Sequence, residues 1–147
     1  MKRQSIIVLT TLSLLVMLTA TSIQAQSDMR IKVTIPFEFS VRDKLLPAGE
    51  YTVKYMSQGT LAIQSVDRHV SQIFSTLSTH ANSKRDESSL VFTRYGDRYF
   101  LSTIWTAGDD IGLALRKPAA EMELLRVWRS SAANASERQT VSIVAHR

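Results

Sequence analysis

Hydrophobic and polar residues alternate with a period of two along several segments of this chain. The most regular segment runs from Ile31 to Val41, where every odd-numbered position is apolar. This alternation is typical of a strand with one buried face and one solvated face. Pro36 falls in the polar set and has no backbone N–H to donate. We therefore expect the strand to be an edge strand or to be bent at that point.

Six further segments have the composition and spacing of strands, and turn residues separate them. They lie at residues 50–57, 60–66, 70–79, 90–95, 98–105 and about 140–146. Segment 70–79 also fits helical spacing, but its serine and threonine content favours a strand. The sequence therefore predicts a mainly β fold of about seven antiparallel strands, as a sandwich or a partly open barrel.

The clearest hairpin is the one that turns at Gly96–Asp97. Glycine in the first turn position supports a two-residue type II′ loop, which needs a positive φ there. A loop of this length fixes the register, so Phe92 should lie opposite Leu101 and Arg94 opposite Tyr99. Both faces of the hairpin carry apolar residues, which predicts a central position in the sheet.

One helix is expected at about residues 118–129, ahead of the last strand. Pro118 suits the first turn of a helix, and Glu121 follows it closely. The apolar stripe of this helix consists of Ala120, Leu124, Val127 and Trp128. The core of the strands is expected to contain Phe37, Phe39, Val53, Phe92, Leu101 and Ile143.

The N-terminal segment has the layout of a secretory signal peptide. Lys2 and Arg3 precede an apolar run over Ile6–Leu18, and Ala25 provides a small residue at the exit. The run is shorter than the roughly 20 apolar residues of a membrane span. We expect cleavage after Ala25, which leaves residues 26–147 as one β-rich domain in the periplasm or outside the cell. An uncleaved N-terminal anchor is the alternative.

Composition narrows the classes of protein further. The chain has no cysteine, which excludes a disulfide scaffold, a thiol enzyme and a zinc finger. It has 18 Lys and Arg against 13 Asp and Glu, a formal net charge of +5, and two of the basic residues belong to the leader. That excess is too small to indicate nucleic acid as a partner. No later segment predicts a transmembrane helix in the mature chain.

Motifs that carry catalysis are absent from the sequence. His69, His80 and His146 show no ligand spacing, and neither a Gly-x-Ser-x-Gly elbow nor a phosphate-binding glycine loop occurs. We therefore predict no catalytic residue, no metal site and no cofactor.

One cluster of side chains suggests a binding surface. Tyr95, Arg98 and Tyr99 lie at the hairpin tip, where aromatic rings beside an arginine can stack on a ligand. The alternative is cross-strand packing within the sheet. These three residues are the predicted binding site.

Three stretches together resemble a group of small exported soil-bacterial proteins of uncharacterised function. They are the IPFEF segment at residues 35–39, LPAGEYTV at 46–53 and RYGDRYFL at 94–101. The resemblance covers most of the mature chain and implies export and a β-rich structure. It implies no activity, cofactor or catalytic residue.

Two classes of function fit these expectations. The first is an exported non-enzymatic module that binds a small ligand, an envelope polymer or a partner protein. The second is a small hydrolase of the cell envelope. An apolar cavity between sheet and helix would favour ligand binding, whereas two acids that converge in a cleft would favour the enzyme.

Overall fold

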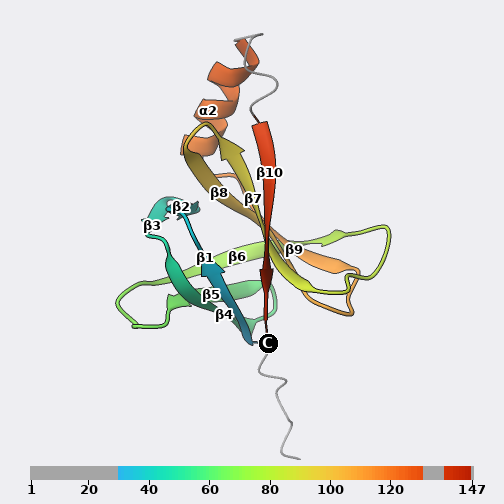
Figure 1. Cartoon of the computed structure of the whole chain (residues 1–147). Helices are drawn as coiled ribbons and strands as arrows, with labels where there is room; N and C mark the ends of the chain where they lie inside the picture. Colours follow the sequence, from blue (N-terminus) through green and yellow to red (C-terminus); the bar gives the residue numbers. More distant parts are fainter. Residues whose placement is uncertain (1–29, 131–137, 147) are drawn as a thin grey trace, which may run out of the picture.

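The computed structural model describes residues 30–130 and 138–146, which form ten strands and one helix (Figure 1). The elements are β1 (Arg30–Ile35), β2 (Phe39–Val41), β3 (Lys44–Leu46), β4 (Gly49–Ser57), β5 (Thr60–Ser65), β6 (Ser71–His80), β7 (Ser88–Tyr95), β8 (Arg98–Trp105), β9 (Ile111–Leu115), α2 (Ala119–Ser130) and β10 (Arg138–Ala145). The predicted class, mainly β with a helix ahead of the last strand, is confirmed. The predicted leader and its cleavage site after Ala25 lie outside the described residues.

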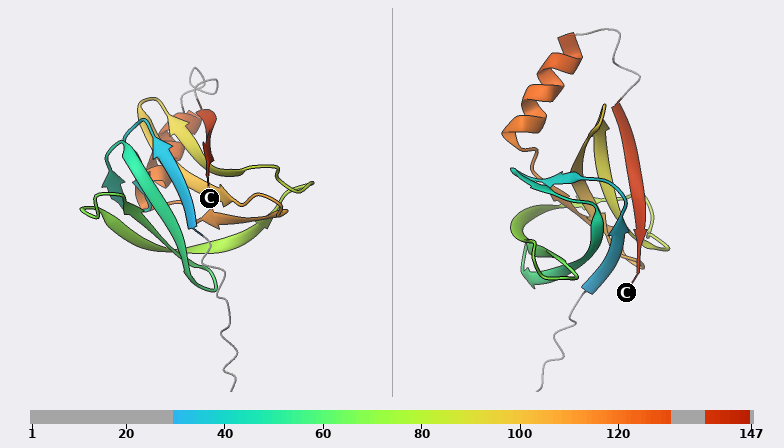
Figure 2. Two further views of the ribbon diagram at one scale, coloured as in Figure 1. Left: turned by 60° about the horizontal axis from the view of Figure 1, so that its bottom comes forward. Right: turned by 60° about the vertical axis from the view of Figure 1, so that its left-hand side comes forward.

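All ten strands belong to one strongly curled sheet. Its main path runs β1-β4-β5-β6-β9-β8, and β8 also pairs with β2 and with β7, which in turn pairs with β10. The curl brings β1 and β10 together at one end, as both views in Figure 2 show. There Lys32 and His146 exchange two backbone hydrogen bonds of 2.7 and 2.8 Å. The two strands meet at this single bridge and form no continuous ladder.

The strand count differs from the expected seven for three local reasons. The first predicted strand is bent, as Pro36 suggests, and its two parts are β1 and β2. Lys44–Leu46 was not among the predicted strands, but it forms the short strand β3 against β2. Ile111–Leu115 carries a weak pattern and forms β9, which fills the gap between β6 and β8. The pairing is also not entirely antiparallel, because β2 runs parallel to β8.

The β7–β8 hairpin has the predicted register, with Phe92 opposite Leu101 and Arg94 opposite Tyr99. Gly96 has a φ of 59°, the left-handed value that the first position of the turn requires. The hairpin is central, since β9 lies on one side of it and β10 on the other.

The concave face of the sheet encloses the main core. Phe39, Val53, Phe92 and Leu101 are buried as predicted. Phe37 and Ile143 are only partly buried, although both pack against the same cluster.

The helix α2 packs on the opposite, convex face, over the tip of the β7–β8 hairpin (Figure 2). Leu125 and Glu121 are buried in this contact, with Leu124 and Trp128 partly buried beside them. The buried face of α2 is therefore rotated relative to the predicted apolar stripe, because two residues of that stripe, Ala120 and Val127, are exposed. The reason is that Glu121, a polar residue, takes a place on the buried face through hydrogen bonds. In the described ranges, no helix is long and apolar enough to cross a membrane.

Candidate functional site

Tyr95, the first of the predicted binding residues, is not at the surface. Its side chain is 2% exposed, and its hydroxyl donates a 3.1 Å hydrogen bond to Oε1 of Glu121. The ring also makes edge contacts with Phe100 and Trp128, at centroid distances of 5.9 and 6.1 Å. The prediction that Tyr95 presents an exposed ring for stacking is therefore wrong, because this side chain is buried and packs against α2.

Arg98 and Tyr99 lie on different faces of the hairpin. The Arg98 guanidinium is exposed and lies 5.4 Å from the ring centroid of Phe100 on the convex side. Tyr99 points to the concave side, where it stacks on Phe37 at 3.9 Å with an interplanar angle of 15°. The structure therefore does not gather the three predicted residues at one surface. A binding role for Arg98 and Tyr99 stays a prediction.

Sequence analysis missed Arg94, which lies on the concave side near Tyr99. Its Nε donates a 2.6 Å hydrogen bond to the carbonyl of Gly96, and its guanidinium lies 5.5 Å from the Tyr99 ring centroid. A cavity of about 280 Å³ opens beside it, lined by Arg94, Gly96, Asp97 and Gln139. Both of these contacts anchor Arg94 within the hairpin itself, so its position is explained without a ligand.

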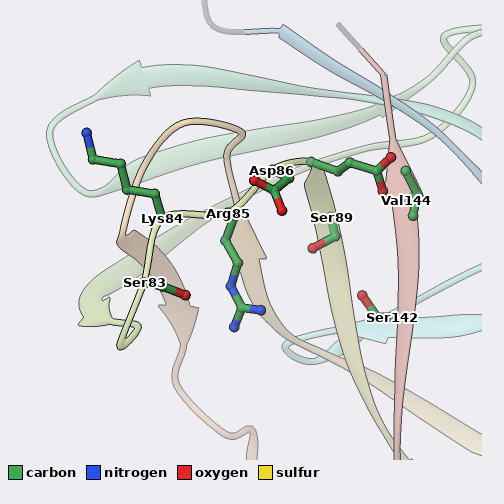
Figure 3. Close-up of a pocket in the computed structure, with 8 residues that line it drawn as sticks. Ser83, Lys84, Arg85, Asp86, Ser89, Ser142 and Val144 are labelled. Atoms are coloured by element: carbon green, nitrogen blue, oxygen red, sulfur yellow. The ribbon is translucent and has the colours of Figure 1, made fainter.

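A cavity of about 500 Å³ lies at the other end of β7 and β10. Its lining comes from the charged loop between β6 and β7 and from outward-facing residues of the two strands: Ser83, Lys84, Arg85, Asp86, Glu87, Ser89, Ser142 and Val144. Figure 3 shows the Arg85 side chain extending into the space in front of Ser89 and Ser142. We call it the Arg85 cavity.

Backbone hydrogen bonds hold the charged loop in place. The Arg85 N–H donates to the carbonyl of Asp109 at 3.0 Å, and the Arg85 carbonyl accepts from the Gly108 N–H at 2.7 Å. A third bond of 2.8 Å joins the Ala81 N–H to the carbonyl of Asp110. The loop is therefore fixed to the neighbouring β8–β9 connection at three points.

The Arg85 side chain is positioned by an aromatic ring. Its guanidinium carbon lies 4.6 Å from the ring centroid of Trp105, a cation–π geometry. Trp105 is 9% exposed and lies flat against Gly112, where an added Cβ would be only 2.6 Å from the ring. Glycine at position 112 therefore makes room for Trp105, and Trp105 supports Arg85.

The lining of this cavity contains both donors and acceptors. Arg85 carries a rigid fork of N–H donors, and Ser89 and Ser142 carry hydroxyl groups that donate or accept. Asp86 and Glu87 add carboxylate acceptors. Such a set suits a hydroxylated ligand that also bears an acidic group. No sequence motif marks this set of residues, because Arg85 and Trp105 meet only through the fold.

No protein-family model, curated protein or solved structure matches this chain. Over the described ranges, no three His, Cys, Asp or Glu side chains gather in a group that could hold a metal ion.

Proposed function

We propose that the protein is an exported, non-enzymatic module that binds an acid-bearing saccharide unit of an envelope polymer in the Arg85 cavity. The observation that supports this most directly is the fixed position of Arg85, between the Trp105 ring and two backbone hydrogen bonds. A guanidinium held in this way loses little freedom when it pairs with a carboxylate. The serine hydroxyls beside it suit the hydroxyl groups of a sugar.

A binding measurement with purified polysaccharide fragments tests the proposal. We expect uronic-acid-containing fragments to bind and neutral fragments of equal length to bind much more weakly. Replacing Arg85 by Ala removes a charge-assisted hydrogen bond, which corresponds to a loss of ~10- to 100-fold in affinity. Lys at this position keeps the charge without the planar fork and should give an intermediate affinity.

The matched control is Arg126→Ala, because this arginine is exposed on α2 and does not line the cavity. It removes the same charge and should bind the fragments as the unaltered protein does. Equal affinity for Arg85→Ala and the control would overturn the proposed site.

Export is part of the same proposal and has its own test. The basic start, short apolar run and small exit residue support cleavage after Ala25. The exported protein should therefore begin at Gln26 when its N-terminus is sequenced. Intact Met1 in a membrane fraction would show an uncleaved anchor instead.

We also propose that the curled sheet is a partly open barrel rather than a sandwich. The support is that β1 and β10 approach from opposite ends of the strand order and meet at one bridge.

One observation favours the hydrolase as a second candidate: Asp86 and Glu87 both line the Arg85 cavity. A hydrolase would release new reducing ends from the polymer, and Asp86→Asn or Glu87→Gln would abolish the release. A binding module releases none. The reducing-end assay therefore separates the two candidates independently of affinity.

A further inference from the structure

The strand β10 is paired with β7 along one edge, and its other edge meets β1 only at the Lys32–His146 bridge. Both strands diverge from that bridge (Figures 1 and 2). The N–H and C=O of His146 point toward β1, and those of alternate residues point to the same edge of an antiparallel strand. The backbone groups of Thr140, Ser142 and Val144 therefore point that way as well. In the described part of the chain, no strand pairs with these three residues on that edge.

This free edge of β10 lacks the features that normally keep strand edges from pairing, which are lysine, proline or a very short strand. The neighbouring edge strand β1 carries Lys32 and is followed directly by Pro36, and the edge strand β3 is three residues long and begins with Lys44. The segment from Thr140 to Ala145 has no charged residue, no proline and no glycine. Four of its six residues are β-branched, which favours the extended conformation. The free edge is therefore suited to accept a further strand.

We infer that two copies of this chain pair through the free edge, with their β10 strands antiparallel about a two-fold axis at Ser142. In this register Ser142 lies opposite Ser142 of the second copy, and Thr140 lies opposite Val144. All three residues then use the backbone groups that point to the free edge. The strand is complementary to itself in this register, because no charged residue opposes another between Thr140 and Val144.

Side chains on both faces of β10 support the pairing. On the concave side Val141 and Ile143 are only partly buried in one copy, and the register places each opposite the other of the second copy. On the outer side Val144 is 47% exposed, and the register places it opposite the β-branched Thr140. Cross-strand pairs of β-branched side chains stabilise a sheet.

The pairing also determines how the two Arg85 cavities are arranged. Ser142 and Val144 line this cavity on the outer face of β10. A two-fold axis that relates two antiparallel strands of one sheet is perpendicular to the sheet, so both copies present the same face on the same side. Both Arg85 cavities then open on one side of the joined sheet. The pairing itself does not depend on the proposed saccharide binding and is tested without a ligand.

Sedimentation velocity over a range of micromolar concentrations tests the inference on the purified protein. We expect the mass of a dimer and no larger species, because the pairing uses up the free edge of each copy. Ser142→Lys places two ammonium groups opposite each other and should weaken the dimer about fivefold or more, with partial recovery at high salt. The control is Ser75→Lys, because Ser75 is exposed on the interior strand β6. It should dimerise normally.

Three outcomes of this experiment would contradict the inference. A monomer at every concentration would overturn it and leave the edge to a strand from another protein. Equal dimerisation of Ser142→Lys and Ser75→Lys would move the interface away from β10. Species larger than a dimer would exclude the closed two-fold arrangement. Circular dichroism should show the same strand content for both variants, because both serines are exposed.

Disulfide cross-linking tests the register, because the chain has no cysteine of its own. Ser142→Cys should form a disulfide-linked dimer on oxidation, since residues directly opposite each other have Cα atoms about 5.5 Å apart. Thr140→Cys is the matched control, because the two Thr140 positions lie roughly 14 Å apart along the paired strands and should not cross-link. Cross-linking through residue 140 in place of residue 142 would overturn the register.

Discussion

At the scale of single residues, Tyr51 shows what the LPAGEY stretch at residues 46–51 does in the structure. Its side chain is 1% exposed, and its hydroxyl donates a 2.7 Å hydrogen bond to the carbonyl of Pro47. The ring also packs edge-on against Phe39 at 5.2 Å. Tyrosine at this place closes the turn between β3 and β4 and contributes to the core with the same side chain. The LPAGEY stretch therefore encodes a turn that is held in place by the buried Tyr51 ring and its hydrogen bond to Pro47.

Burial makes the stability contributed by Tyr51 dependent on pH. Desolvation, with a smaller effect from the Asp67 charge, raises the pKa of Tyr51 above its usual 10.0 in the folded protein. The folded state then holds this proton more tightly than the unfolded state. The contribution is therefore complete below about pH 10 and is lost as the pH rises above that value.

We expect Tyr51→Phe to lose ~1 kcal/mol of unfolding free energy near neutral pH, because the hydrogen bond to Pro47 is removed. Above about pH 10 the difference between the two proteins should shrink, since only the unaltered protein carries the tyrosine that resists ionisation. Denaturant melts from pH 7 to 11 measure this difference. A constant difference across the range would contradict the raised pKa.

Gly96 is the residue on which the hairpin turn depends. Its φ of 59° strains any residue with a Cβ, and β-branched valine most of all. Gly96→Val should therefore cost ~1–3 kcal/mol, whereas Asp97→Asn at the exposed second position should be nearly neutral. Urea melts compare the two. Equal midpoints would mean that the tight turn is not required.

At the scale of elements, α2 is held by a buried carboxylate. Glu121 is 2% exposed, and its Oε1 accepts hydrogen bonds from the Tyr95 hydroxyl at 3.1 Å and from Lys117 Nζ at 2.6 Å. The pattern of apolar residues could not reveal this, because a glutamate in the first helical turn is normally solvated. The sequence analysis placed Tyr95 at the surface for the same reason, because it could not reveal that the Tyr95 hydroxyl has a buried hydrogen-bond partner in Glu121.

Removing Glu121 should loosen the helix from the hairpin. Glu121→Ala leaves the Tyr95 hydroxyl without its acceptor and should cost ~1–3 kcal/mol, with Lys117 still partly solvated. Trp128 fluorescence follows the helix contact during denaturation. Glu123→Ala is the control, because Glu123 is exposed in its pair with Arg126 and should change stability by less than ~0.5 kcal/mol. Equal losses for the two variants would show that the buried bonds do not hold α2.

The elements that the sequence predicted share a clear local signal. The β7–β8 hairpin was predicted to its register, because a two-residue turn leaves no freedom in pairing. The strands β3 and β9 were missed, because they are short and depend on neighbours distant in the sequence. The Arg85 cavity was missed for the same reason, because Arg85, the supporting Trp105 and the β10 residues Ser142 and Val144 come from three separate segments.

At the scale of the whole molecule, the β7–β8 hairpin separates two hydrophobic clusters. Phe92 and Leu101 face the large cluster inside the curled sheet, whereas Tyr95 and Phe100 face the small cluster under α2. The two clusters therefore share the same pair of strands. Loss of the inner cluster should unfold the molecule, and loss of the outer one should first release the helix.

Substitution of Phe92 tests whether loss of the inner cluster unfolds the whole molecule. Phe92 is fully buried and makes edge contacts with Phe37 and Phe39, at ring-centroid distances of 5.3 and 5.5 Å. Phe92→Ala should cost ~3–5 kcal/mol and lower the melting temperature of the whole protein. Met122→Ala on the exposed side of α2 should leave it nearly unchanged. An unaltered melting temperature in Phe92→Ala would contradict the position of the inner core.

The bridge between Lys32 and His146 has a consequence for how the chain matures. The concave core is sealed by β10, the strand that is synthesised last among those described, and this strand contacts both β1 and β7. A nascent chain that still lacks β10 cannot complete this core, because the contacts of β10 with β1 and β7 join segments that are distant in the sequence. We therefore expect the domain to fold as one unit after its last described strand has been synthesised, rather than progressively from its N-terminal strands.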